Sequence, residues 1–347
     1  MSVAGLILSN LHDAKLPALT TKRTMGAVPF GGRYRLIDFP LSAMVGAQLS
    51  QIYVIAHHNY QSLMEHIGSG KDWDMARHKG GIHIVPPFSA AYANPEESYV
   101  SRIASLVSIR GLVDRIEEEH VLCCDCDAIG VPDFAAFIAA HKESGLPMTV
   151  GLEQDESPSA FGDLHIWIAR TDFLREVLRD AQERRFHSFY VDVVRREAGK
   201  GNVGTYTFAE RFYRIHSLSQ YYQLHMLLAT DATVRRELLE FDERPIFTKV
   251  QNSPPTKYGA NAHVRGSLIA DGCVIEGTVI NSVLSRGVHV GKDAVVENAV
   301  VLERCRIIDK AEISGAVLDK NVVLGGSTRL CGHPTLPFFV EEGKIIE

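Results

Sequence analysis

Apolar and polar positions follow two different patterns along this chain of 347 residues. In the first two thirds, short apolar runs alternate with segments of helical periodicity, an order typical of βαβ units built around a sheet. The predicted strands are Val3–Leu8, Gln51–Ala56, Gly81–Val85, His120–Cys124, Met148–Leu152, Leu164–Ala169 and Gly204–Phe208. The predicted helices are Leu36–Met44, Asn59–Ile67, Ser98–Ser108, Val131–Lys142, Thr171–Ala181, Leu218–Leu228 and Asp231–Glu240.

From about Asn261 onward, apolar residues recur every six positions instead. One series is Val290, Val296, Leu302 and Ile308, and another is Val295, Val301, Ile307 and Ile313. A six-residue period corresponds to one face of a three-sided parallel β-helix, whose apolar side chains stack in a triangular core. An immunoglobulin-like sandwich would require two-residue alternation between hairpin turns, which this segment lacks.

Residues 244–258 separate the two patterns, because they contain prolines and show no period. We therefore expect an α/β domain over residues 1–243, a linker over 244–260 and a β-helix domain over 261–347.

Composition indicates a globular protein, with 46% hydrophobic and 22% charged residues. A formal net charge of −6 gives no general reason to bind nucleic acid or an anionic membrane. Apolar runs are shorter than the roughly 18 residues of a membrane span, and the first residues lack the basic region of a signal peptide. We expect a cytoplasmic protein.

The six cysteines form neither paired CxxC motifs nor a regular framework, so we predict small core side chains in a reducing compartment rather than zinc ligands. They are Cys123, Cys124, Cys126, Cys273, Cys305 and Cys331.

The most specific local string is VPFGGRYRLIDFPLS at residues 28–42, a Gly-Gly bend followed by basic residues and an apolar run. Further characteristic strings are HIGSGKDWD at 66–74, SPPTKY at 253–258, AVLDKN at 316–321 and VEEGKIIE at 340–347. Over nearly its whole length the chain resembles ADP-glucose pyrophosphorylases, which make ADP-glucose for glycogen or starch. The resemblance implies a nucleotidyltransferase-like α/β domain with a mixed sheet, followed by a left-handed parallel β-helix.

Members of that family carry LAGGxGxRLxPLT after the first strand, because a triphosphate needs closely approaching backbone N–H groups, flexible glycines and a cation. Here Asn10, Leu11 and Asp13 occupy the glycine positions, and Lys15 occupies the Arg position. In left-handed geometry Leu11 would cost about 1–2 kcal/mol, and Asp13 would place a negative charge beside phosphates. We predict that this loop does not bind ATP.

Other family features are also altered. Met25 replaces a lysine that contacts the reacting phosphates, a change that would lower the rate by about two to three powers of ten. The family holds Mg²⁺ with two aspartates; Asp125 matches the first, whereas Arg214 replaces the second. Residues 153–158 lack the lysine of the family's glucose 1-phosphate site.

Four basic residues match family positions that bind activator phosphates: Lys22, Arg23, Arg35 and Lys320. They predict either a sugar-phosphate effector site or a set of solvated or salt-bridged side chains. A retained scaffold with lost chemistry resembles the regulatory D-type subunits of the family. That resemblance implies a heterotetramer with a catalytic subunit, or a homo-oligomer, in which this chain needs no cofactor and the catalytic partner uses Mg²⁺.

Two alternatives remain open. The chain could be an active or weakly active adenylyltransferase with a rebuilt site around Asp125 and Asp127, or a hexapeptide acyltransferase using His289 or His333. The helix face around Tyr221 and Tyr222 and the edges of the β-helix are candidate interfaces, with internal packing as the other interpretation.

Overall fold

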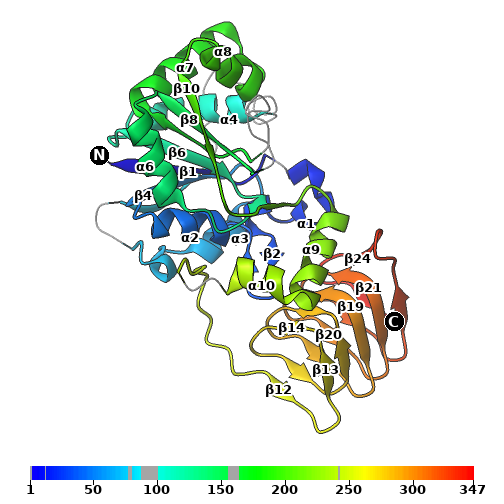
Figure 1. Ribbon diagram of the computed structural model, residues 1–347. Coiled ribbons are helices and arrows are strands. Elements are labelled where there is room, and N and C mark those ends of the chain that lie inside the picture. Colours follow the sequence, from blue (N-terminus) through cyan, green and yellow to red (C-terminus); the bar gives the residue numbers. More distant parts are fainter. Residues whose placement is uncertain (1, 12, 77–79, 87–100, 155–163, 241–242) are drawn as a thin grey trace. The chain divides into compact units, whose positions relative to one another are not determined.

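The computed structural model describes residues 2–11, 13–76, 80–86, 101–154, 164–240 and 243–347 (Figure 1). They form two compact units. Unit 1 comprises Met1–Ala14, Arg23–Ala27 and Ile37–Tyr213, and unit 2 comprises Lys15–Lys22, Val28–Leu36 and Arg214–Glu347. Within the described part of the chain, no helix is long and apolar enough to cross a membrane.

A seven-stranded mixed sheet organises unit 1, in the order β10-β8-β9-β6-β1-β4-β5. The strands are β1 (Val3–Leu8), β4 (Gln51–Ile55), β5 (Gly81–Val85), β6 (His120–Asp125), β8 (Met148–Leu152), β9 (Trp167–Arg170) and β10 (Val203–Thr207). β1 pairs in parallel with β4 and β6, whereas β9 is antiparallel to β6 and β8. The predicted mixed sheet is confirmed.

Helices cover this sheet, and all but two short ones, over residues 110–113 and 196–198, lie close to predicted positions. They are α2 (Asp38–Gly46), α3 (Gln61–Ile67), α4 (Arg102–Ser108), α5 (Arg110–Val113), α6 (Phe134–Ser144), α7 (Thr171–Arg184) and α8 (Arg196–Ala198). α6 begins three residues later than predicted because Asp133 caps it by accepting a hydrogen bond from the Ala136 N–H at 2.8 Å. Residues 98–100 of another predicted helix lie outside the described part.

A π-helix over Phe189–Arg195 was not predicted from the sequence. It buries Phe189, Val193 and Val194, and this i, i+4, i+5 spacing does not distinguish a π-helix from an α-helix. Phe189 stacks on the indole ring of Trp167 at a centroid distance of 5.0 Å. Tertiary packing rather than local periodicity therefore fixes this element.

Five of the six cysteines are buried and only Cys331 is exposed; none forms a disulfide. Burial raises the pKa of the Cys123, Cys124 and Cys126 thiols well above its ordinary value. These three thiols therefore stay protonated, as expected for core side chains.

Unit 2 contains a parallel β-helix, drawn from yellow to red in Figure 1. One of its sheets consists of β12 (Lys257–Tyr258), β15 (Val274–Ile275), β18 (His289–Val290), β20 (Arg306–Ile307), β22 (Val323–Leu324) and β25 (Ile345–Ile346). The other strands are β13 (His263–Arg265), β14 (Leu268–Ile269), β16 (Thr278–Ile280), β17 (Val283–Leu284), β19 (Val295–Val301), β21 (Glu312–Leu318), β23 (Arg329–Cys331) and β24 (Phe338–Val340). The β-helix already begins within the predicted linker, at Lys257.

The coils that link β17, β19 and β21 are one residue shorter than three full hexads, whereas the coil from β14 to β17 spans 15 residues and the one from β21 to β24 spans 22. Val283 pairs with Val300, and Val300 pairs with Val317. A strict six-residue series therefore drifts out of register by one position per coil. Val290 and Val296 lie in the core, whereas Ile308, which the strict series also placed there, is only half-buried.

Helices α9 (Leu218–Thr230) and α10 (Ala232–Leu239) belong to unit 2, although the sequence placed them in the first domain. α9 packs on β17 and β19. The Tyr222 hydroxyl donates a 2.7 Å hydrogen bond to the carbonyl oxygen of Asn298 in β19, and the Tyr221 hydroxyl donates one of 2.7 Å to that of Pro29. Both rings are buried within unit 2, so the interpretation of this face as an interface is wrong.

Candidate functional site

The central strand β1 positions the first candidate site at the carboxyl edge of the sheet. Its last residue, Leu8, pairs with Ile55 of β4 on one side and with Asp125 of β6 on the other. The residues that follow β1 therefore lie beside Asp125. In sheets of this kind, ligands bind at the carboxyl ends of the parallel strands.

Side chains of the loop after β1 bind backbone N–H groups. The Asp13 carboxylate accepts a 2.7 Å hydrogen bond from the Met25 N–H and one of 2.7 Å from the Asn10 side-chain amide. Asn10 accepts in turn from the N–H of His57. A phosphate-binding loop instead presents such N–H groups to its ligand. In this chain the Asp13 carboxylate accepts the hydrogen bond of the Met25 N–H, which a phosphate would otherwise need.

The prediction of backbone strain at Leu11 is wrong. Neither Asn10 nor Leu11 has a positive φ, so the backbone does not adopt the left-handed geometry that the glycine-rich family motif led us to expect. Leu11 packs against the core of unit 1 instead. The loop has a different conformation that suits its own residues.

Apolar side chains fill the space in front of this loop. Met25 is buried, with 1% of its surface exposed. The gap enclosed by Leu8, Leu11, Met25, Asp125, Cys126 and Asp127 leaves a volume of about 0 Å³ into which a water molecule could fit. Sites for small molecules typically measure roughly 300–1,000 Å³. The structure thus brings Leu11, Met25 and Asp125 together around a gap much smaller than a nucleotide site.

Asp125 has a counter-ion that the sequence analysis missed. Arg102, the first residue of α4, forms an ion pair and hydrogen bond with Oδ2 of Asp125 through its Nη2 atom. Both side chains are buried, at 9% and 2% exposure. Burial disfavours the charge on Arg102, but Asp125 and Tyr190 outweigh it and raise the pKa of the guanidinium. This arginine therefore remains charged.

The residues around Asp125 do not fit a magnesium ion. Mg²⁺ in proteins is bound by carboxylate and other oxygen ligands in near-octahedral geometry. Among the residues that the structure describes, no group of three His, Cys, Asp or Glu side chains could hold a metal. Arg102 also supplies a positive charge at the carboxylate that a metal would use.

Other residues predicted for the catalytic site belong to unit 2 or fall outside the described residues. Lys15 is exposed and Arg214 half-buried, both in unit 2. The expectation that Arg214 replaces a metal ligand stays a prediction. Of the shortened substrate loop only residues 153 and 154 are described, and residues 155–158 lie outside.

The predicted phosphate-binding cations divide between the units. Arg23 is buried in unit 1, whereas Lys22, Arg35 and Lys320 belong to unit 2. Nζ of Lys320 lies 3.4 Å from Oε2 of Glu303, and Nζ of Lys22 lies 3.9 Å from Oε2 of Glu342. Lys320 and Lys22 therefore form salt bridges within unit 2. Neither carboxylate was singled out from the sequence.

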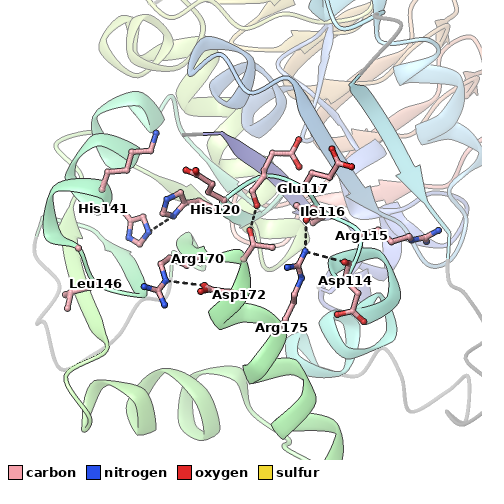
Figure 2. Close-up of a pocket in the computed structure, with 15 residues that line it drawn as sticks. Asp114, Arg115, Ile116, Glu117, His120, His141, Leu146, Arg170, Asp172 and Arg175 are labelled. Carbon is pink, nitrogen blue, oxygen red and sulfur yellow. Dashed lines mark hydrogen bonds and ion pairs between the residues drawn. The ribbon is translucent and has the colours of Figure 1, made fainter.

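A larger cavity, of about 1080 Å³, lies where β6 begins, at the amino end of that strand (Figure 2). Nδ1 of His120 lies 3.1 Å from Nε2 of His141, whose Nδ1 lies 2.8 Å from the hydroxyl of Thr149. Burial, reinforced by His120, lowers the pKa of His141 to about 4, so this ring is neutral at pH 7. None of the predicted site residues lines the cavity, and its walls carry both acidic and basic side chains.

The two histidines singled out for acyl transfer show no catalytic arrangement among the described residues. Nε2 of His289 lies 3.6 Å from Oε2 of Glu276 on the β-helix. His333 is exposed, with its Nδ1 2.8 Å from the hydroxyl of Thr335.

Comparisons with known proteins agree with the fold. Residues 4–168 match the nucleotidyl transferase family, and residues 254–333 match the GlmU-like, C-terminal hexapeptide family. Glycogen biosynthesis protein GlgD of Geobacillus stearothermophilus is 33% identical over 295 residues, which cover 84% of this chain and 82% of the relative.

Two further relatives match over most of their length. Glycogen biosynthesis protein GlgD of Bacillus subtilis (strain 168) is 29% identical over 341 residues, covering 98% of this chain and 96% of the relative. Glucose-1-phosphate adenylyltransferase of Clostridium beijerinckii is 27% identical over 329 residues, covering 86% of this chain and 84% of the relative.

Proposed function

This chain belongs to the family of glycogen biosynthesis protein GlgD and glucose-1-phosphate adenylyltransferase, and from that premise we propose that it is a regulatory subunit of ADP-glucose pyrophosphorylase. In this proposal the catalytic partner converts glucose 1-phosphate and ATP into ADP-glucose and diphosphate in the cytoplasm. The chain itself does not catalyse the reaction. It assembles with the partner into a heterotetramer.

The ion pair between Arg102 and Asp125 carries the proposal of lost catalysis. Transfer between phosphates requires positive charge on the reacting oxygens, and family enzymes obtain part of it from Mg²⁺ on carboxylates. In this chain the Asp125 carboxylate already has a cation within hydrogen-bonding distance, the guanidinium of Arg102. Removing one partner of such a buried pair typically costs about 3–5 kcal/mol, so a metal would have to overcome a comparable loss.

The loop after β1 supports the same conclusion independently. Phosphate oxygens would have to displace the Asp13 carboxylate from the Met25 N–H, and the buried Met25 thioether supplies no charge. Loss of one electrostatic contact to the transition state typically lowers a rate by about two to three powers of ten. No cofactor is therefore assigned to this chain, and Mg²⁺ acts in the catalytic partner.

Regulation would operate through the equilibrium between conformations of the partner. A subunit that contacts a competent conformation better than an incompetent one shifts the population towards it, and about 1–3 kcal/mol of coupling changes affinity about 5- to 150-fold. Any sugar-phosphate effector would act on the same equilibrium.

The test is an assay of three samples: the chain alone, a catalytic glucose-1-phosphate adenylyltransferase from the same organism alone, and their mixture. Each contains glucose 1-phosphate, ATP and Mg²⁺, and ADP-glucose formation is measured. We expect no turnover by the chain alone and an increase in the mixture. Turnover by the isolated chain that disappears in Asp125→Asn would instead establish an active enzyme around Asp125 and Asp127.

A further inference from the structure

The cavity of unit 1 that lies where β6 begins has two polar side chains on one face of the sheet (Figure 2). His120, the first residue of β6, pairs with Arg170, the last residue of the antiparallel strand β9. Directly opposed residues of antiparallel strands place their side chains on the same face of a sheet, close together. Both side chains line the cavity.

Three buried side chains form a row of hydrogen bonds that ends at this cavity. Nδ1 of His120 lies 3.1 Å from Nε2 of His141, and Nδ1 of His141 lies 2.8 Å from the hydroxyl oxygen of Thr149. His120, His141 and Thr149 are 7%, 1% and 3% exposed. Burial is the main cause that lowers the pKa of both imidazoles, to about 4 in His141, so both rings are neutral at pH 7.

The hydroxyl of Thr149 sets the direction of these hydrogen bonds. A buried hydroxyl proton needs an acceptor, and among the described residues this hydroxyl has Nδ1 of His141 as its partner. With Thr149 as the donor, the proton of neutral His141 is on Nε2 and is donated to Nδ1 of His120. The proton of neutral His120 is then on Nε2. This N–H has no hydrogen-bond partner in the part of the chain that the structure describes, and it is open to the cavity.

Arg170 adds further donors on the same face. Its Nε donates a 3.2 Å hydrogen bond to Oδ1 of Asp172, whereas its two terminal nitrogens form no hydrogen bond with the residues described. The side chain is 46% exposed. A guanidinium group binds the oxygens of carboxylates and phosphates through paired hydrogen bonds. His120 and Arg170 therefore present several N–H donors to the cavity from the same face of the sheet.

The acidic residue next to His120 in the sequence lies on the other face of the sheet. The Thr171 N–H donates a 2.9 Å hydrogen bond to the carbonyl oxygen of Glu119, which extends the pairing of β6 with β9 by one residue. Side chains alternate along a strand, so Glu119 lies on the face opposite to that of His120. The face that carries His120 is therefore suited to a ligand with acceptor oxygens and negative charge.

We propose that this face of the cavity binds a small molecule that carries an oxyanion, a carboxylate or a phosphate, which accepts hydrogen bonds from Nε2 of His120 and from the terminal nitrogens of Arg170. The cavity volume of about 1080 Å³ is that of a site for a small organic molecule rather than for an ion alone. The site lies at the amino end of β6, whereas Asp125 is the last residue of that strand. The inference therefore holds whether or not the chain modulates a catalytic partner.

The test uses inorganic phosphate and acetate as separate probes of the full chain. Thermal unfolding is followed at increasing concentration of each probe, with chloride balancing the ionic strength. A ligand that binds only the folded state raises the unfolding midpoint, and a concentration well above Kd should raise it by about 2 °C or more. Phosphate also stabilises folded proteins without binding to a site, so the native chain is compared with Arg170→Gln at every concentration. We expect a saturable rise in the native chain and its loss in Arg170→Gln.

Two further variants assign the response to these residues. His120→Phe keeps a ring at this position and removes the N–H, so it should also lose the saturable rise. Arg115→Gln is the matched control, because Arg115 lines the same cavity but its Nε donates a 3.0 Å hydrogen bond to the carbonyl oxygen of Gly111. It should respond as the native chain does. A rise with phosphate alone identifies a phosphate ester as the ligand class, and a rise with acetate identifies a carboxylic acid.

Three results would overturn the proposal. One is a native chain whose midpoint shows no saturable rise with either probe. Another is an equal rise in the native chain and in Arg170→Gln, which would place the binding elsewhere. The third is an equal loss of the response in Arg115→Gln and Arg170→Gln, which would show a general effect of charge. If His120→Phe does not fold, the comparison of the two arginine variants decides.

Discussion

The backbone N–H of Gly31 donates a 3.2 Å hydrogen bond to Nε2 of His225. The same ring has its Nδ1 2.8 Å from the carbonyl oxygen of Tyr221, which can only accept, so Nδ1 carries the proton. Gly31 lies with φ at +57° in the turn between β2 (Pro29–Phe30) and β3 (Tyr34–Arg35). The neutral, fully buried imidazole thus fastens this hairpin to α9 within unit 2.

This arrangement predicts acid sensitivity. Burial lowers the pKa of His225 to about 4, against 6.5 for the ordinary side chain, so between these values the unfolded chain binds more protons than the folded one. The free energy of unfolding therefore falls as pH drops from 6.5 towards 4. Urea denaturation across this range should show a flatter pH dependence in His225→Gln, whose side chain does not titrate. His263→Gln, at an exposed position, is the control, and identical slopes for His225→Gln and the native chain would contradict the prediction.

Arg102→Gln should destabilise unit 1 strongly. The variant leaves the buried Asp125 carboxylate without its cation, and such a loss costs about 3–5 kcal/mol. Arg110→Gln is a matched control, because the Arg110 side chain is 39% exposed and its pair with Asp114 should contribute less than about 1 kcal/mol. Chemical denaturation measures both, and adding Asp125→Asn to Arg102→Gln should recover part of the stability. Equal effects of the two arginine substitutions would contradict the assigned ion pair.

Asp13→Ala removes the acceptor for the Met25 N–H and for the Asn10 amide. Leaving a partly buried donor unpaired costs about 1–3 kcal/mol, so we expect a loss in this range. Asp13→Asn, which retains one acceptor oxygen, should lose less. Thermal denaturation with and without ATP tests both variants. A larger loss of stability in Asp13→Asn than in Asp13→Ala would show that the lost hydrogen bonds do not cause the destabilisation.

Tyr222→Phe removes one hydrogen bond between α9 and β19 and leaves the ring in place. The expected loss is about 1 kcal/mol in the free energy of unfolding. Tyr258→Phe is the control, since Tyr258 is 54% exposed. Comparable stability of the two variants would mean that the hydroxyl of Tyr222 does not help to hold the helix on the β-helix.

Local patterns predicted the elements of this protein well, because strands such as Val3–Leu8 are buried along their whole length and leave a continuous apolar run. The Arg102–Asp125 pair could not be predicted in this way. Arg102 comes to Asp125 through the packing of α4 in unit 1, and neither residue's neighbours in sequence specify the other. The available signal was indirect: an ionised carboxylate at the end of a buried strand requires a cation nearby.

The prediction that assumed the backbone geometry of the family's glycine-rich loop was wrong. Strain at Leu11 was expected because glycine-rich loops take left-handed conformations, yet Leu11 has a negative φ and packs on the core. Without glycine, a Cβ atom disfavours the left-handed conformation, so the backbone adopts a conformation with negative φ instead. The sequence shows which residues occupy the glycine positions of the loop. It does not show the backbone conformation that the loop adopts with these residues.

The pairing of residue 283 with 300, and of 300 with 317, makes the coils over residues 283–299 and 300–316 equivalent structural modules. Removing or duplicating residues 283–299 as a block would return every later side chain to an equivalent place, since contacts in such stacks link neighbouring modules. Removing a single residue would instead turn every later core position in that coil towards a different face. The length of this part of the molecule is therefore free to change in whole coils.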